Sequence, residues 1–296
     1  MSDSTLLDKS LIAKIRGIQF RAKYLVTDSF AGEYQSAFKG RGIEFEEVRE
    51  YQPGDDVRSI DWNVTARSGR PFIKLHRDER ELTVMFLVDV SGSSRFGSEK
   101  KFKNEISAEI SALLAYTALK NNDKVGLLVF SDHVEHFLPP KKGRGHVWQL
   151  IRDILTFQSK HSSTNILPAL EYIGRILKRR SIIFVISDFI DVDLGTPLAT
   201  LARRHDVVAV RVFDQREREF PKIGYLNLKD AESGEETIID SSSESFRQSF
   251  QQNLDQMDLN WERFLNLSGI EHMDIPTNET YMDVINRFFR SKHKKR

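Results

Sequence analysis

The 296-residue sequence has no cysteine, almost no net charge and no long apolar run. The absence of cysteine excludes disulfide bridges, thiolate metal sites and cysteine nucleophiles. The 44 basic and 43 acidic residues leave a formal net charge of +1, so the chain has no general attraction to nucleic acid or to an anionic membrane. No apolar stretch approaches the roughly 18 residues that span a bilayer, and the N-terminus lacks the basic-then-apolar order of a signal peptide. We therefore expect a soluble, cytoplasmic protein with no nucleic-acid partner and no membrane contact.

Sequence motifs of several common enzyme classes are also missing. No G-x-x-x-x-G-K-[ST] occurs, so we expect no P-loop, and any ATP hydrolysis would belong to a partner. Neither G-x-S-x-G nor an equivalent nucleophile turn is evident. The eight histidines show no metal-ligand spacing such as H-E-x-x-H. The sequence therefore predicts no catalytic residue and no nucleotide cofactor.

The most informative stretch is an apolar run at residues 83–88 that ends in one carboxylate and a cluster of hydroxyls. Its β-branched and aromatic residues predict a strand buried on both faces. In open α/β sheets, ligands bind in the crevice beyond the carboxyl end of such a strand. Asp89, Ser91 and Ser93 stand at that end, and their oxygens suit a hard cation such as magnesium.

Strand and helix patterns alternate after this stretch. Apolar runs at 124–130, 182–186 and 207–212 predict buried strands, and 133–138 predicts a short edge strand that Pro139 and Pro140 terminate. Helices are predicted over 99–119, with Phe102 in the buried stripe, and over 145–157, 166–177 and 198–203. The alternation predicts an α/β fold with a Rossmann-like, mostly parallel sheet and helices on both faces.

The regions that flank this alternation have other patterns. Residues 1–81 predict a basic amphipathic helix over 6–25, packed on its own domain, and a small β layer docked against the main sheet. Residues 214–290 predict a hairpin, a long helix with one apolar face over 246–265, and a last helix near 281–289. A basic tail at 291–296 is expected to be solvated. The predicted domains are therefore 1–81, 82–213 and 214–290, followed by that tail.

Three separate stretches place oxygen donors where a parallel sheet would bring them together. Asp89, Ser91 and Ser93 follow the first strand, Thr164 precedes the 166–177 helix, and Asp188 ends the 182–186 strand. A small cation that takes six ligands could use these five oxygens and an outside carboxylate. Each residue also has a structural alternative, because serine and threonine cap helices and aspartate closes Asx turns. Their joint order along the chain favours the metal site.

These residues carry a resemblance to a known site. D-V-S-G-S at 89–93, S-T-N-I at 163–166 and I-S-D-F at 186–189 resemble the metal-ion-dependent adhesion site of von Willebrand factor A domains. The resemblance implies a magnesium ion, or a manganese ion, at the top of a Rossmann-like sheet, with a partner carboxylate completing its coordination. The implied ligands are Asp89, Ser91, Ser93, Thr164 and Asp188. Phe189 stands where many A domains have glycine.

A second resemblance covers most of the chain. F-E-E-V-R-E-Y at 45–51, P-G-D-D-V-R at 53–58, I-D-W at 60–62 and T-A-R at 65–67 resemble the signature of bacterial domain-of-unknown-function family 58. Members carry an A-type domain and are commonly encoded beside MoxR-type AAA+ ATPases, which implies a cytoplasmic adaptor or co-chaperone for such an ATPase. Within the signature, we expect an Arg58–Asp61 ion pair under Trp62 to stabilise the fold, with an interface role as the alternative.

The leading hypothesis is a non-enzymatic adaptor. A magnesium-bearing A domain would recognise an acidic side chain on a MoxR-type ATPase or on that ATPase's client. The first alternative is a metal-dependent phosphoesterase, because Asp89 and Asp188 near magnesium could orient a phosphate. The second alternative is a nucleic-acid-binding protein, suggested by the basic run at 141–144.

Overall fold

A computed structural model describes residues 9–38, 43–78, 81–97, 101–157, 159, 163–190, 195–219, 221–229 and 234–294. The expected start of the first helix at 6–8, the start of the helix at 99, and tail residues 295–296 lie outside these ranges. The elements in chain order are α1 (Lys9–Leu25), α2 (Asp28–Phe38), β1 (Ile43–Glu50), η1 (Val57–Ser59), α3 (Trp62–Ser68), β2 (Phe72–Asp78), β3 (Thr83–Asp89), η2 (Gly92–Arg95), α4 (Lys103–Lys120), β4 (Lys124–Phe130), β5 (Val134–Lys141), α5 (Arg144–Thr156), α6 (Leu167–Ile176), β6 (Ile182–Ser187), α7 (Gly195–Arg204), β7 (Asp206–Phe213), η3 (Gln215–Glu217), β8 (Tyr225–Lys229), β9 (Glu236–Asp240), α8 (Glu244–Ser268), β10 (Glu271–Pro276) and α9 (Tyr281–Lys294).

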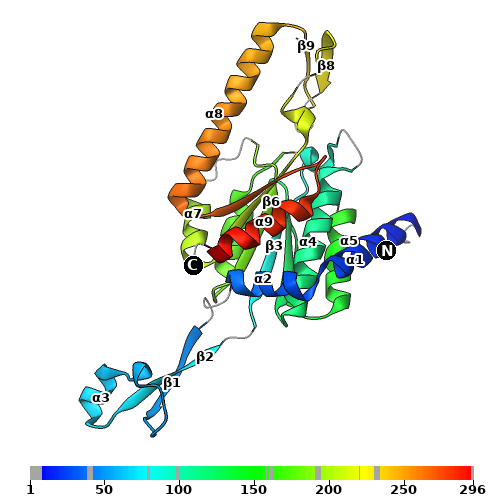
Figure 1. Cartoon of the computed structure of the whole chain (residues 1–296). Helices are drawn as coiled ribbons and strands as arrows, with labels where there is room; N and C mark the ends of the chain where they lie inside the picture. Colours follow the sequence, from blue (N-terminus) through cyan, green and yellow to red (C-terminus); the bar gives the residue numbers. More distant parts are fainter. Residues whose placement is uncertain are drawn as a thin grey trace.

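A six-stranded sheet forms the centre of the molecule (Figure 1). Its strand order is β10-β7-β6-β3-β4-β5. The pairs are parallel except β4–β5, which is antiparallel. The predicted mixed α/β architecture with a central, mostly parallel sheet is therefore confirmed.

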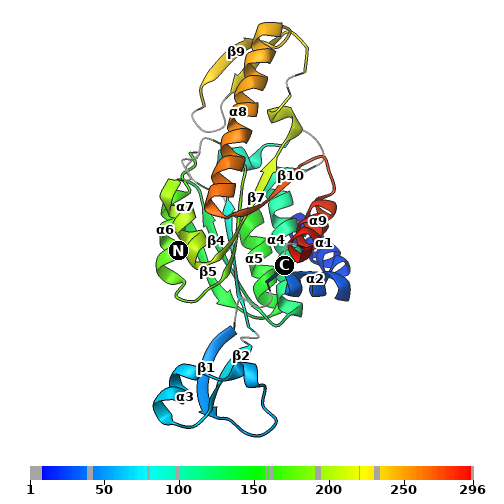
Figure 2. The same ribbon diagram turned by 60° about the vertical axis from the view of Figure 1, so that its left-hand side comes forward.

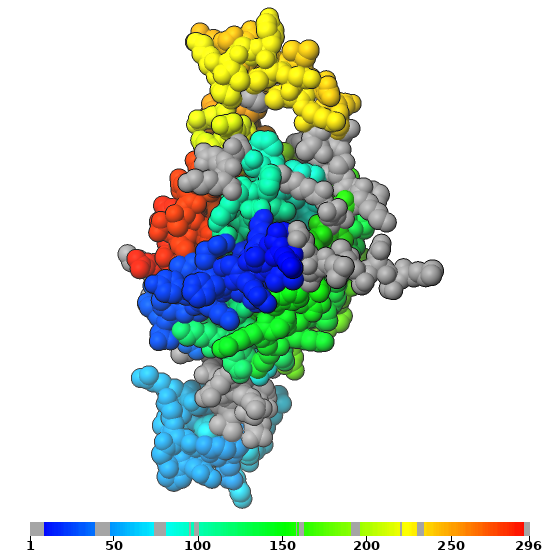
Figure 3. Space-filling view, turned by 90° about the vertical axis from the view of Figure 1, so that its right-hand side faces the viewer, coloured from blue at the N-terminus to red at the C-terminus, as the bar shows by residue number. Residues whose placement is uncertain are grey.

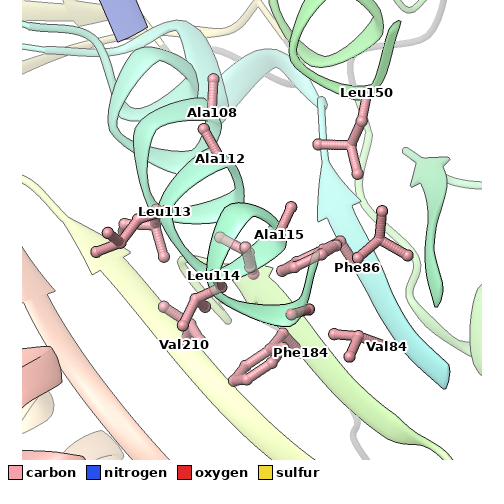
Figure 4. Packing of buried hydrophobic residues seen from close by; sticks show 14 of the residues in the cluster. Val84, Phe86, Ala108, Ala112, Leu113, Leu114, Ala115, Leu150, Phe184 and Val210 are labelled. Carbon is pink, nitrogen blue, oxygen red and sulfur yellow. The ribbon is translucent and has the colours of Figure 1, made fainter. Parts of the chain in front are cut away.

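Successive residues of β3 point to opposite faces and enter two separate hydrophobic cores. Val84, Phe86 and Val88 join one core with α1, α2, α4, α5 and α9. Met85 and Leu87 join the other with α6, α7 and one end of α8. Figure 2 shows the two groups of helices on opposite sides of the sheet. Figure 4 shows α4 packed directly over the strands. Phe86 stacks there on Phe184 of β6, with 5.6 Å between the ring centres.

Residues 43–78, here called the lobe, lie away from the six-stranded sheet (Figures 1 and 3). β1 and β2 form a separate two-stranded antiparallel sheet. The expectation that this β layer docks against the main sheet is wrong, because its strands pair with each other and α3 covers β2 locally. Asp61 caps α3, and Thr65 Oγ1 accepts a hydrogen bond from the Phe72 amide. Trp62 is 68 % exposed instead of covering a buried ion pair.

Residues 221–229 and 234–257, here called the arm, extend beyond the opposite end of the sheet (Figures 1 and 2). The predicted hairpin is present as β8–β9. α8 has 25 residues and is therefore about 37 Å long. The predicted apolar face from 246 to 265 is buried only at its C-terminal end, because only that part of α8 reaches the sheet: Trp261 and Leu265 are buried, whereas Met257 is 42 % exposed.

Arg211 of β7 attaches α8 to the sheet. Its guanidinium binds Asp258 of α8 at 2.7 Å and Asp274 of β10 at 2.6 Å. It also lies 5.7 Å from the Trp261 ring centre. β10, which the sequence did not predict, pairs in parallel with β7, so strand pairing and ion pairs both fix the base of the arm.

Several local predictions were wrong. Lys292 lies within α9 instead of a solvated tail, because its ammonium binds Glu271 and lies 4.1 Å from the Phe38 ring centre. Phe102 precedes α4 and is 49 % exposed. β5 continues through Pro139 and Pro140 to Lys141, which an edge strand tolerates because its outer side needs no amide donor. The sequence also did not predict α2.

Across the described ranges, no helix has the length and hydropathy needed to cross a membrane.

His205, between α7 and β7, predicts a pH dependence of stability. It is buried, and neither ring nitrogen has a hydrogen-bond partner among the described residues. Burial and, secondarily, the Arg204 guanidinium lower the pKa of His205 to about 4, whereas the unfolded chain should show about 6.5. The part of the unfolding free energy that depends on the neutral imidazole is therefore fully present above about pH 6.5, and it is lost as the pH falls towards 4.

We expect the unfolding free energy of His205→Leu to fall less between pH 7 and pH 4 than that of the unmodified protein, as measured by urea titration at a series of pH values. His272→Leu, at an exposed position of β10, is the control and should follow the unmodified protein. Equal slopes for His205→Leu and the unmodified protein would contradict the assignment.

Candidate functional site

The site lies between the carboxyl ends of β3 and β6, which are neighbours in the sheet. From β3 the chain runs through α4 on one face to β4, and from β6 it runs through α7 on the other face to β7. The strand order therefore reverses between β3 and β6, and such a switch point opens a crevice at the carboxyl ends of the strands. Asp89 ends β3, Ser187 ends β6, and Asp188 directly follows Ser187.

Asp89 is buried and uses both carboxylate oxygens within the protein. Oδ1 accepts a hydrogen bond from the Ser91 amide at 2.9 Å, and Oδ2 accepts one from the Ser187 hydroxyl at 2.7 Å. Burial, and next the negative charge of Asp188, raise the pKa of Asp89 to about 6, although these hydrogen bonds oppose the rise. The environment of Asp89 therefore favours an added positive charge, either a proton or a cation.

Ser91 and Ser93 present their hydroxyls to each other. Their Oγ atoms are 3.1 Å apart. Ser91 occupies the N-cap position of η2 but makes no side-chain capping bond there, whereas Ser94 Oγ donates to the Ser91 carbonyl at 2.8 Å. The capping alternative therefore does not account for the Ser91 hydroxyl.

Asp188 lies in a buried ion cluster. Its Oδ2 accepts a hydrogen bond from Lys103 Nζ at 2.9 Å, and its Oδ1 accepts one from the Ile190 amide at 3.3 Å, as in an Asx turn. Lys103 Nζ also binds Glu217 Oε1 at 2.6 Å. Burial lowers the pKa of Lys103, but Asp188 and Glu217 outweigh this effect and raise it above its ordinary value.

Sequence reasoning missed Lys103 and Glu217, although signals for both were present. Lys103 stands three, four and seven residues before the buried positions Ile106, Ser107 and Ile110 of α4, so helical periodicity places it on the buried face. Glu217 forms a capping box with Asp214 in η3. A lysine at a core position predicts a carboxylate partner, because a buried ammonium needs one.

Thr164 has a different position from the other predicted ligands. It lies in the loop before α6, and the following Asn165 amide donates to the Ser131 carbonyl just beyond β4 at 2.9 Å. Asn165 Oδ1 accepts a hydrogen bond from the Leu167 amide at the start of α6. The structure thus brings Asp89, Ser91, Ser93 and Asp188 to the β3–β6 crevice, and it places Thr164 on the β4 side of that crevice.

A cavity of about 10 Å³ lies within the cluster, which is room for about one water molecule. Its polar lining comes from Asp89, Ser93, Ser94, Lys103, Ser107, Ser187 and Asp188. Three large apolar side chains nearby are partly exposed: Phe96 (41 %), Phe102 (49 %) and Ile190 (42 %). Each of them is linked to a residue of the site. The Lys103 amide donates to the Phe96 carbonyl at 3.0 Å, and Phe102 directly precedes Lys103. The Ile190 amide donates to Asp188 Oδ1.

The cluster fits a hard divalent cation in donor type and in charge. Lys103 pairs with Asp188 and Glu217, and Asp89 lies beside Asp188. With Asp89 ionised, these four described side chains carry three negative charges and one positive charge. Carboxylate and hydroxyl oxygens are the ligands that magnesium prefers. In the part of the chain that the structure describes, no three His, Asp or Glu side chains form a metal-binding group, so a metal here would depend on hydroxyl oxygens.

Phe189 connects the site with α8. Its φ is 55°, in the left-handed region that favours glycine. Its ring lies against Trp261 of α8, with 4.6 Å between ring centres. The contact between these two aromatic rings offsets the backbone strain.

The fold and the cluster define a mixed α/β protein with an oxygen-rich site at the switch point of a mostly parallel sheet. Comparison with known proteins then identifies the family. The chain belongs to the family "Protein of unknown function DUF58", whose model matches residues 47–258. This match includes the lobe signature from residue 47 onward and the β3–β6 site.

The chain is similar to two uncharacterized bacterial proteins. It shares 32 % identity over 230 residues with Rv1480 of Mycobacterium tuberculosis, covering 77 % of this chain and 73 % of that protein. It shares 28 % identity over 107 residues with YeaD of Bacillus subtilis, covering 36 % of this chain and 25 % of that protein.

Solved structures show weaker similarity. BatB from Bacteroides thetaiotaomicron, a conserved hypothetical protein, matches with a TM-score of 0.44 and 15 % identity over 73 % of this chain and 100 % of that one. An aerotolerance-related membrane protein from Bacteroides fragilis matches with a TM-score of 0.46 and 15 % identity over 71 % of this chain and 99 % of that one.

The charge balance predicts that Asp89→Asn increases stability in the absence of metal. Asparagine keeps an acceptor for the Ser91 amide, and the Ser187 hydroxyl can reorient to accept from the new amide group. The substitution removes a buried charge next to Asp188, so the unfolding free energy in EDTA at pH 7 should rise by about 1–2 kcal/mol.

Asp153→Asn is the matched control, measured by the same urea titration. Asp153 is buried too, but Arg152 and His136 bind its carboxylate, so neutralising it should destabilise the protein. Destabilisation of Asp89→Asn by as much as Asp153→Asn would contradict the charge balance described for Asp89.

Proposed function

We propose that the protein is a metal-dependent protein-binding adaptor or co-chaperone with a von Willebrand factor A-like, Rossmann-like domain. Magnesium, or manganese in its place, would be held by oxygens of Asp89, Ser91, Ser93, Thr164 and Asp188. The partner is an acidic side chain on a MoxR-type AAA+ ATPase or on its client. The proposed location is the cytoplasm, and the proposed role involves no chemical turnover by this chain.

The size of the cavity is the observation that carries this proposal. About 10 Å³ accommodates an ion or one water molecule, whereas small-molecule sites usually have several hundred Å³. The alternative of a metal-dependent phosphoesterase requires room for a phosphoester beside Asp89 and Asp188, so the size of this cavity favours recognition over hydrolysis.

The surroundings of the site support a protein partner. Phe96, Phe102 and Ile190 expose apolar surface around a charged centre, an arrangement typical of interface hot spots. Ser93 is half-buried and lines the cavity together with Asp89 and Asp188. When bound there, magnesium supplies a Lewis-acidic coordination position that a partner carboxylate can fill.

Magnesium should stabilise the protein if the site binds it. An ion that binds only the folded state adds about 2.7 kcal/mol when its concentration is 100 times its dissociation constant. We expect thermal unfolding to shift upward with magnesium and with manganese, and the shift to disappear in Asp89→Ala. The control is Asp255→Ala at an exposed position of α8, which should keep the shift. Melting temperatures independent of both ions over a wide range would contradict the metal site.

Capture of a partner should depend on the metal. In a pull-down with a purified MoxR-type ATPase from the same organism, we expect binding in magnesium and loss of binding in EDTA or with Asp89→Ala. Asp255→Ala should bind as the unmodified protein does. Binding that persists in EDTA would contradict recognition through the metal.

Turnover of a generic phosphoester that Asp188→Ala abolishes would favour the hydrolase instead.

A further inference from the structure

Lys103 is a buried cation in direct contact with the proposed metal site. It is 2 % exposed and lines the same cavity as Asp89, Ser93 and Asp188. Its Nζ lies 2.9 Å from Asp188 Oδ2 and 2.6 Å from Glu217 Oε1. Lys103 is also the first residue of α4, where the positive end of the helix dipole disfavours a cation. Its position therefore depends on these two carboxylates.

Glu217 is held in place for this contact from a separate segment of the chain. Its Oε2 accepts a hydrogen bond from the Asp214 amide at 3.0 Å, which leaves Oε1 directed at Lys103. Asp214 in turn accepts a hydrogen bond from the Thr277 hydroxyl beyond β10 at 2.9 Å. The position of Glu217 therefore does not depend on Asp188, and Lys103 keeps one carboxylate partner when Asp188 acquires another.

We propose that Lys103 is the resident cation of the site, which competes with a divalent ion for Asp188 and thereby sets the affinity of the site for that ion. The inference rests on the proposed function to the extent that Asp89 and Asp188 hold the ion. Lys103 is a positioning residue, because it acts on the ion through the Asp188 carboxylate.

The competition predicts opposite effects for two substitutions. Lys103→Met retains an unbranched side chain of similar length and removes the positive charge, so the ion meets a more negative site. Glu217→Gln removes the carboxylate that compensates Lys103, so the ammonium repels the ion more strongly. Because charges a few ångströms apart interact by at least about 1 kcal/mol even in a strongly polarisable environment, each change should alter the dissociation constant by about fivefold or more.

Isothermal titration of the full-length chain with magnesium chloride, and separately with manganese chloride, measures these effects. The matched control is Lys120→Met at the other end of α4, where Lys120 pairs with the exposed Asp28. It makes the same change of charge away from the site and should leave the dissociation constant unchanged. Glu217→Gln retains the Lys103–Asp188 ion pair, so it provides a folded variant if Lys103→Met does not fold. Circular dichroism of each variant in EDTA establishes its folding.

Tighter binding by Lys103→Met together with weaker binding by Glu217→Gln supports the inference. Metal binding by Lys103→Met but not by the unmodified protein also supports it and overturns the proposed metal-dependent function. Dissociation constants within twofold of the unmodified protein in both variants overturn the inference and leave the proposed function standing. No metal binding by any folded variant overturns both.

Discussion

The need to compensate two buried carboxylates at one edge of the sheet determines how the site is built. Asp89 ends β3 and Asp188 directly follows the neighbouring strand β6, and the negative charge of Asp188 makes the ionised state of Asp89 more costly. Lys103 supplies one positive charge, and Glu217 holds Lys103 from the opposite side. A single electrostatic cluster therefore joins the ends of β3 and β6, the start of α4 and the segment after β7. The negative charge that remains in this cluster suits a divalent ion.

The sheet carries a projection at each end (Figure 3). The lobe contains the family signature, and its aspartates act locally: Asp55 binds Arg49 at 2.7 Å, Asp56 caps η1 and Asp61 caps α3. The arm is joined to the sheet through Arg211 and through the Phe189–Trp261 contact. Phe189 directly follows Asp188, so the base of the arm lies next to the site, whereas the lobe lies beyond the other end of the strands.

Sequence periodicity predicted the parts of the fold in which neighbouring residues decide the outcome. The runs that became β3, β4, β6 and β7 are largely apolar because both faces of the sheet are covered, and that pattern is visible without a structure. Asp89, Ser91, Ser93 and Asp188 could be predicted for the same reason, since carboxyl ends of parallel strands meet at one edge. β10 was missed because its alternation of polar and apolar residues is short. The extent to which α8 is buried could not be predicted, because an apolar stripe does not reveal how much of it has a partner.

The sequence by itself determined the strand–helix alternation, the absence of cysteine chemistry and the oxygen-rich ends of two strands, because these properties depend on residue type and on spacing along the chain. Only the tertiary structure decided which charges meet. Lys103 lies 85 residues from Asp188 and 114 from Glu217, and no local pattern encodes such a pairing. The structure likewise placed Thr164 on the β4 side of the site and Trp62 in solvent. Packing sets these contacts, because the position of a side chain depends on where the neighbouring elements come to rest.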